Sequence, residues 1–231
     1  MNQNMGMDIH SHILYMKRGK IMILSDKHIK KLMLKNLLTE EVINDIQLQP
    51  NSIDLTLGNT YKKLKANSHQ SNSLNKIPVF KHADAETAWL VDPRYPMEYE
   101  EGTFNTDENG NEYYIIQPNE FVLMASNEII KIPNGIIGLI CGRSSIARLG
   151  LQTEQAGFID AGFRGTLTLE IHNQNHHPII LWSGMRIAQV YFMESKRSDR
   201  LYGKDKNSKY NDQIKATESR IYLDPEMVKK L

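Results

Sequence analysis

The stretch that decides the fold class is Thr166-Leu167-Thr168-Leu169-Glu170-Ile171. Its apolar side chains occupy every second position, and threonine or glutamate stands between them. A period of two is typical of a β-strand that places one face on a core and the other face away from it. The stretch therefore predicts a half-buried strand with Glu170 on the polar face.

Much of the remaining chain has the same character. Four further segments are apolar enough for strands: residues 52–57, 119–126, 136–140 and 187–192. Between them, residues 67–75 and 102–111 are rich in Asn, Asp, Ser and Gly, which predicts loops. Many short strands with irregular connections favour a mainly β barrel or sandwich over a parallel α/β sheet.

One helix is expected near the N-terminus, over residues 26–38, with Ser25 as its N-cap. Apolar residues recur there at i, i+3, i+4 and i+8: Ile29, Leu32, Met33 and Leu37. Residues 1–21 contain basic side chains but no apolar core segment or cleavage site of a signal peptide. We expect them to form an N-terminal extension.

The composition is that of an ordinary globular domain. Of the 231 residues, 40% are hydrophobic and 24% are charged, which excludes a disordered or fibrous chain. The 28 Lys and Arg residues nearly balance the 27 Asp and Glu residues, so no positive field favours nucleic acid as a partner. Polar residues interrupt every long apolar run, and we expect no membrane span. The single cysteine, Cys141, excludes an internal disulfide and a Cys-rich zinc site, and it fits a reducing cytoplasm.

Residues 142–150 combine two guanidinium groups and two hydroxyl groups between glycines. Their sequence is Gly142-Arg143-Ser144-Ser145-Ile146-Ala147-Arg148-Leu149-Gly150. Arginine forks and the N–H groups of a tight turn bind phosphate, although the Lys and spacing of a P-loop are missing. A capped turn with two solvated arginines explains the segment equally well.

A second glycine-rich loop, residues 156–165, contains the carboxylate of Asp160 among apolar side chains. Asp160 suits either a water or sugar contact or a local Asx turn. Glu170 is an ordinary strand residue unless its face lines a pocket, where burial would raise its pKa and enable proton transfer.

Three histidines, His172, His176 and His177, suggest a metal site, but no carboxylate or cysteine completes the set. We expect a surface hairpin there, with a turn at residues 173–175. The zinc-deaminase signature needs a Cys-x-x-Cys pair, which one cysteine cannot supply. Any deamination by this chain would proceed without catalytic zinc.

Taken in order, several motifs resemble the dCTP deaminase family of the trimeric dUTPase superfamily. The first is Gln49-Pro50-Asn51-Ser52-Ile53-Asp54-Leu55-Thr56-Leu57-Gly58. Residues 142–151, 156–165 and 168–170 follow, and the last motif contains Tyr202, Lys209, Tyr210 and Gln213. The resemblance extends from about Met22 to Leu223.

The resemblance implies a distorted β-barrel of the dUTPase-like type with few short helices. It also implies a homotrimer with active sites between subunits, and Mg²⁺ bound through the phosphates of dCTP or dUTP. Residues 22–198 would form the β domain, and residues 199–231 would close over the nucleotide. The product would be dUTP, or dUMP with pyrophosphate, which supplies dUMP for thymidylate synthesis.

The resemblance also assigns roles to individual residues. Glu170 would shuttle the proton for attack of water at C4 of cytosine, with Ser144 and Arg148 of a neighbouring subunit beside it. Asp160 would bind the 3′-hydroxyl group and serve triphosphate hydrolysis. The remaining substrate contacts would come from Arg143, Ser145, Ala156, Phe163, Tyr202, Lys209 and Gln213.

The chain departs from the family pattern in two places, and two other functions also remain open. The chain has Gln155 and Thr153 where the family commonly has Thr and His, and residues 98–111 have no family role. One alternative is a dUTP pyrophosphatase, in which Asp160 positions the attacking water and Glu170 has no catalytic use. The other is a nucleotide-binding regulatory protein without turnover. The presence of both Arg148 and Glu170 favours deamination.

Overall fold

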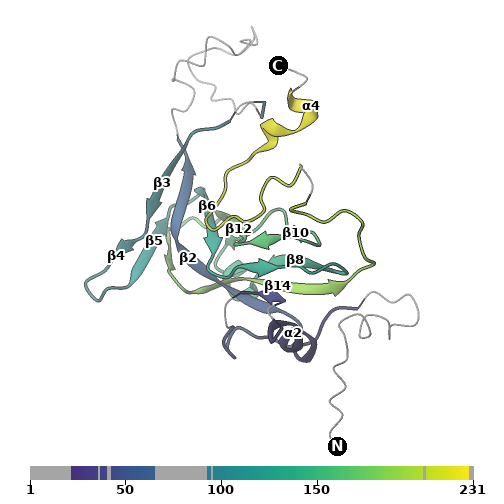
Figure 1. Cartoon of the computed structure of the whole chain (residues 1–231). Coiled ribbons are helices and arrows are strands. Elements are labelled where there is room, and N and C mark those ends of the chain that lie inside the picture. Colours follow the sequence, from purple (N-terminus) through teal and green to yellow (C-terminus); the bar gives the residue numbers. More distant parts are fainter. Residues whose placement is uncertain are drawn as a thin grey trace, which may run out of the picture.

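A computed structural model describes six parts of the chain, residues 22–35, 37–40, 43–65, 93–94, 96–204 and 207–228 (Figure 1). The expected extension at residues 1–21 and the expected loop at residues 67–75 lie outside the described residues. Within the described parts, no helix is long and apolar enough to cross a membrane.

An eight-stranded antiparallel sheet forms the body of the molecule, in the order β10-β8-β14-β2-β6-β12-β9, with β3 paired to β2. The strands are β2 (Ile53–Leu64), β3 (Tyr99–Thr103), β6 (Phe121–Ser126), β8 (Ile136–Gly142), β9 (Leu151–Gln152), β10 (Phe158–Ile159), β12 (Thr168–Asn173) and β14 (Arg186–Glu194). Register shifts interrupt β2 between Leu57 and Tyr61 and β14 between Arg186 and Ala188. Such irregularities bend strands, and the sheet curls into a half-barrel (Figure 1).

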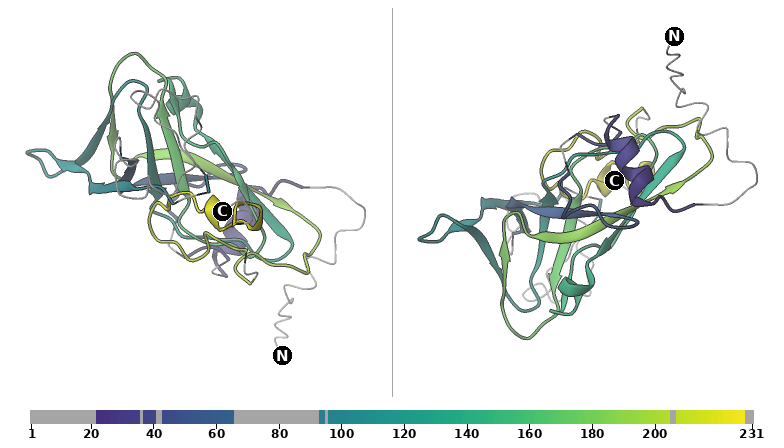
Figure 2. Two further views of the ribbon diagram at one scale, coloured as in Figure 1. Left: turned by 90° about the horizontal axis from the view of Figure 1, so that it is seen from above. Right: turned by 90° about the horizontal axis from the view of Figure 1, so that it is seen from below.

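Two small sheets extend the half-barrel. One has the order β1-β7-β11, and the other has the order β13-β5-β4. Their strands are β1 (Leu38–Thr39), β7 (Ile130–Lys131), β11 (Arg164–Gly165), β13 (Ile179–Trp182), β5 (Glu112–Ile116) and β4 (Asn105–Thr106). Figure 2 shows the teal hairpin of β4 and β5 projecting away from the body in both views.

The prediction of a mainly β fold is confirmed, because the described helices are few and short. They are α2 (Asp26–Met33), α3 (Ser144–Ala147), the 3-10 helix η2 (Ile221–Leu223) and α4 (Pro225–Val228). The predicted strands are also confirmed, and the side chains of Ile53, Leu55, Leu57, Leu169 and Ile171 are fully buried in the core.

The first helix begins at Asp26 with Ser25 at the N-cap position, as predicted, but the prediction of its C-terminal end is wrong. The helix ends at Met33 rather than residue 38, because Leu38 pairs with Lys131 in a small sheet and has a positive φ of 87°. Ser25 occupies the N-cap position, but its hydroxyl group bonds to Nδ1 of His28 and not to a helix N–H group.

Two predictions about connections are also wrong. Residues 102–111 contain the end of β3 and all of β4, and only the turn held by Asp107 matches the expected loop. The histidine segment is not a hairpin, because β12 pairs with β6 and β9 whereas β13 pairs with β5. The structure of both segments depends on which distant strands they pair with. The composition of a turn does not indicate those pairing partners.

Candidate functional site

A cavity of about 600 Å³ lies between the strand face that holds Glu170 and the C-terminal segment. This volume is typical of a small-molecule site. Seven residues expected at the site line the cavity: Ala156, Asp160, Phe163, Glu170, Tyr202, Lys209 and Gln213. They come from three separate sequence motifs, and the fold brings them to one place.

Glu170 reaches the cavity because of the alternation in β12. Leu169 and Ile171 are fully buried on the core face, so Thr168 and Glu170 point the other way and line the cavity. The backbone N–H of Gln155 donates to Oε2 of Glu170 at 3.1 Å. Burial raises the pKa of the Glu170 carboxyl group, and the nearby charge of Glu154 adds to the rise, against the backbone N–H bonds. A carboxyl group in this state suits proton transfer in both directions.

The loop at residues 156–165 forms a second wall and depends on close backbone contacts. Gly162 has a φ of +99°, and a Cβ atom there would lie 2.5 Å from the carbonyl oxygen of Tyr202. The Tyr202 N–H donates to the Ala161 carbonyl at 2.9 Å, and the rings of Phe163 and Tyr202 lie 5.9 Å apart. The glycine therefore allows the C-terminal segment to pack directly on the loop. Asp160 lies on the cavity side of this loop and is exposed.

The C-terminal segment is attached to β12 and its neighbourhood through Gln213. Its Nε2 donates to the Thr166 carbonyl at 2.7 Å and to Oγ1 of Thr168 at 3.2 Å. Among the described residues, Oε1 of Gln213 is buried and has no hydrogen-bond partner. An unpaired buried acceptor is costly, and this one belongs to a residue of the cavity wall.

Lys209 is the only cationic side chain among the described residues that line the cavity. Its Nζ pairs with both carboxylate oxygens of Asp224 at 2.8 and 2.9 Å. The same ammonium group lies 5.8 Å from the centre of the Tyr210 ring.

Four expected site residues are not part of the cavity in this single chain. Ser144, Ser145 and Arg148 are exposed on or next to α3, and their side chains make no hydrogen bond or ion pair within the described residues. Arg143 is held instead by Asp54, whose Oδ2 lies 3.2 Å from Nε, and it donates from Nη1 to the Arg186 carbonyl at 2.9 Å. Ser144, Ser145 and Arg148 are therefore accessible to another molecule.

Sequence reasoning missed several residues of the cavity wall, among them Tyr99, Thr168, Glu218 and Ser219. The strand alternation placed Thr168 on the same face as Glu170 and could have identified it. No local pattern marks Tyr99 or Glu218, because their position depends on how β3 and the C-terminal segment meet.

The described residues contain no group of three or more His, Cys, Asp or Glu side chains arranged for a metal ion. His176 and His177 are exposed in the connection between β12 and β13.

Comparison with known proteins extends these observations. A crystal structure of 2′-deoxycytidine 5′-triphosphate deaminase from Agrobacterium tumefaciens superposes with a TM-score of 0.54 and 21% sequence identity. The match covers 77% of this chain and 49% of that chain. This likeness shows that the chain shares the mainly β fold of that protein.

Sequence similarity identifies the family within that fold class. A family model described as dCTP deaminase-like matches residues 23–195. A relative from Sulfurihydrogenibium sp. named "dCTP deaminase, dUMP-forming" is 38% identical over 204 residues, which cover 88% of this chain and 99% of the relative. One of the same name from Persephonella marina is 35% identical over 206 residues, with 88% and 99% coverage. The chain belongs to the dCTP deaminase-like family.

Proposed function

We propose that this protein deaminates dCTP and then hydrolyses the triphosphate, so that the products are ammonia, dUMP and pyrophosphate. The carboxyl group of Glu170 carries the proposal, because it combines a position in the cavity with a raised pKa. Relatives named "dCTP deaminase, dUMP-forming" that match nearly their whole length support the substrate and the product.

The deamination needs one group that takes a proton and returns it. Glu170 in its ionised form accepts a proton from the attacking water, whose oxygen forms a bond to C4 of cytosine. The protonated carboxyl group passes this proton to N3 of the ring. It then takes the proton of the new C4 hydroxyl group and delivers it to the exocyclic nitrogen, so that the C4–N4 bond breaks, ammonia leaves and the C4 carbonyl group of uracil forms. The N–H of Gln155 holds the carboxylate in place for both transfers.

The charge of the cavity supports a site shared between subunits. A triphosphate has several negative charges, whereas Lys209 is the only cation of this chain among the described cavity residues. Arg143 and Arg148, with Ser144 and Ser145, would come from the α3 region of a neighbouring subunit in a homotrimer. Arginine is well suited to bidentate phosphate contacts.

Magnesium would enter bound to the nucleotide. Hard oxygen ligands from phosphates suit Mg²⁺, and the bound ion neutralises part of the phosphate charge. Asp160 is the cavity residue whose oxygen atoms would complete such a complex or orient water for the second hydrolysis.

The loop that contains Asp160 supports dUMP as the product. Gly157 lies so close to β8 that a Cβ atom there would overlap the carbonyl oxygen of Ile140. Ala156, next to it, lines the cavity with a small side chain, which would leave room for the α-phosphate at that point of the loop.

A time course with dCTP and, separately, dUTP in the presence of Mg²⁺ tests the proposal. We expect equal amounts of ammonia, dUMP and pyrophosphate from dCTP. Stoichiometric dUTP without pyrophosphate would limit the enzyme to deamination. Hydrolysis of dUTP with no reaction of dCTP would replace the proposal with a dUTP pyrophosphatase, and no turnover of either would contradict it.

A further inference from the structure

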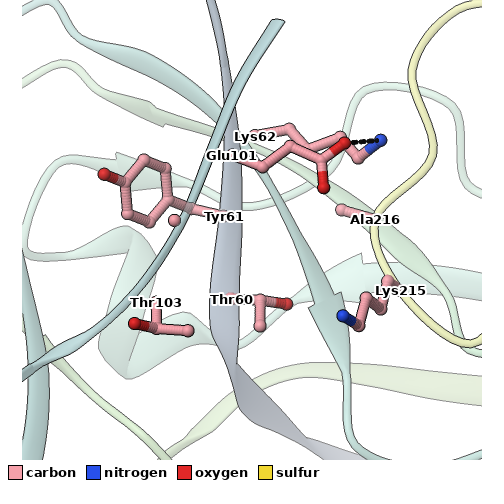
Figure 3. Close-up of a pocket in the computed structure, with 8 residues that line it drawn as sticks. Thr60, Tyr61, Lys62, Glu101, Thr103, Lys215 and Ala216 are labelled. Carbon is pink, nitrogen blue, oxygen red and sulfur yellow. Dashed lines mark ion pairs between the residues drawn. The ribbon is translucent and has the colours of Figure 1, made fainter.

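Lys62 connects the β2–β3 ribbon to the C-terminal segment. Its Nζ lies 2.7 Å from Oε1 of Glu101 on the adjacent strand β3 and 2.6 Å from Oε2 of Glu218. Figure 3 shows Lys62 and Glu101 facing each other, with Lys215 and Ala216 of the C-terminal segment alongside. Lys62 is mostly buried, with 16% of its side chain exposed.

The C-terminal segment does not pack on the large core where it passes the ribbon. A hollow of about 230 Å³ separates the two, lined by Thr60, Tyr61, Lys62, Glu101, Gly102, Thr103, Lys215 and Ala216 (Figure 3). Ala216 is buried at this crossing and belongs to a small apolar cluster with Leu123 and Ala125, against which Tyr99 packs. A segment that buries so little apolar surface depends on a few polar contacts for its position.

The residues that follow form part of the wall of the nucleotide cavity. Thr217, Glu218 and Ser219 all line it. The Thr217 N–H donates at 3.1 Å to Oγ1 of Thr168, on the strand of Glu170. The ion pair with Lys62 therefore lies directly behind the cavity wall.

Lys62 affects the charge at the cavity wall as well as the attachment of the C-terminal segment. Burial opposes the charged form of Lys62, but the hydrogen bonds that Lys62 donates to Glu101 and Glu218 outweigh it and raise the pKa of the ammonium group. The hydrogen bond from Lys62 also lowers the pKa of Glu218. Without Lys62, an ionised Glu218 would lose its hydrogen-bonded cation, and the charge of Arg220 would offset only part of the negative charge at a cavity that must accept a triphosphate.

We propose that Lys62 is a positioning residue for the nucleotide site. It fixes Glu218 and the C-terminal segment at the cavity wall and cancels the charge of Glu218 there. The inference rests on the proposed function, since it concerns the binding of a nucleoside triphosphate in that same cavity. It also gives a role to the ribbon that includes Glu101, for which the sequence motifs offered none.

The decisive experiment compares KM and kcat for dCTP in four proteins: the parent, Lys62→Met, Glu218→Gln and the double variant. We expect Lys62→Met to raise KM by about fivefold or more with a much smaller change in kcat, because a partly buried pair is lost and a bare charge remains. The double variant should bind better than Lys62→Met, because the carboxylate of Glu218 at the cavity wall is gone, whereas Glu101 is mostly exposed and does not line the cavity. If Lys62 has only a structural role, the double variant should have a KM as high as that of Lys62→Met. That result would overturn the proposal.

A matched control lies on the same ribbon. Lys65 pairs with Glu98 at 3.7 Å, both side chains are 49% exposed, and neither of them lines the cavity. Lys65→Met should leave KM unchanged, whereas an equal rise in KM for Lys65→Met and Lys62→Met would show a general effect of the ribbon and contradict the specific role.

Affinity and proteolysis give readouts that do not need turnover. Calorimetric binding of dCTP should be weaker in Lys62→Met, and trypsin should cut the nucleotide-free variant in the C-terminal segment faster than the parent. If the parent binds dCTP but releases no ammonia, the proposed function fails while these two measurements still decide the role of Lys62. Equal affinity and equal cleavage rates in the variant and the parent would overturn it.

Discussion

The protonation behaviour of Glu170 comes from its neighbours rather than from the residue type. Burial in the cavity wall raises the pKa of its carboxyl group, backbone N–H groups oppose the rise, and the charge of Glu154 adds to it. A glutamate on a solvated strand face would remain an ordinary ionised side chain. The alternation of β12 and the position of the loop at residues 155–156 together create the surroundings that raise this pKa, which the proposed acid–base role of Glu170 requires.

A substitution at Glu154 tests this explanation of the raised pKa of Glu170 without changing Glu170 itself. Removing its negative charge in Glu154→Gln lowers the pKa of Glu170. Attack of water needs ionised Glu170, so kcat/KM decreases as the pH falls through that pKa. We therefore expect the acid limb of the kcat/KM profile to move to lower pH. The same change at exposed Glu108, in the turn before β5, should leave the limb in place. A limb that stays or moves to higher pH in Glu154→Gln would contradict the assignment.

At the scale of elements, the sequence predicts those strands whose two faces differ. The alternation in residues 166–171 and 52–57 matches buried residues in β12 and β2. The same reasoning ends β2 at residue 57, whereas the strand continues to Leu64. The residues beyond Leu57 are only partly buried and pair with β3 and β6, so their sequence has no apolar period to detect.

At the site, too, local sequence motifs identify some residues, whereas others reach it only through contacts between distant segments. Motif resemblance identifies Glu170, Asp160 and Lys209, and the structure brings them to one cavity. Tyr99 and Glu218 reach the same wall only because β3 and the C-terminal segment converge, which no local pattern encodes. The expected contribution of Ser144 and Arg148 stays a prediction, because it depends on a second subunit.

Packing of the C-terminal segment on the loop at residues 156–165 depends on Gly162. In Gly162→Ala, a left-handed backbone and overlap with the backbone of Tyr202 act together, so we expect the free energy of unfolding to fall by about 2 kcal/mol or more. Gly110→Ala is the matched control, with a φ of +83° and no atom within 4 Å of the added Cβ. It should cost about 1 kcal/mol, from backbone strain alone. Equal losses in urea unfolding would show that contact with Tyr202 adds nothing.

At the scale of the whole molecule, one chain supplies only part of the machinery that we propose. The half-barrel provides the cavity with Glu170, while α3 presents Arg148 and Ser144 on the surface without partners among the described residues. A site between subunits requires this arrangement, in which one subunit provides the cavity and its neighbour provides the exposed side chains.

Mixed trimers test the division directly. Subunits with Arg148→Ala and subunits with Glu170→Gln should each be inactive alone, and their mixture should regain part of the ammonia release from dCTP. Each hybrid trimer can contain one site with an intact Glu170 and an intact Arg148. Mass measurement shows whether hybrids have formed, and hybrids without activity would place the whole site within one chain.

The rate of ammonia release from dCTP by Glu170→Gln is the measurement that tests the central claim most directly. The amide keeps the shape of the side chain but cannot accept and return a proton, so we predict a loss of at least about a hundredfold in kcat. An ionised buried carboxylate destabilises the fold at pH above its raised pKa, and this cost disappears as the pH falls below the ordinary value. At pH 8 the variant should therefore unfold at a temperature no lower than the parent, and it should still bind dCTP in calorimetry. A folded, dCTP-binding variant that releases ammonia at nearly the parental rate would contradict the account.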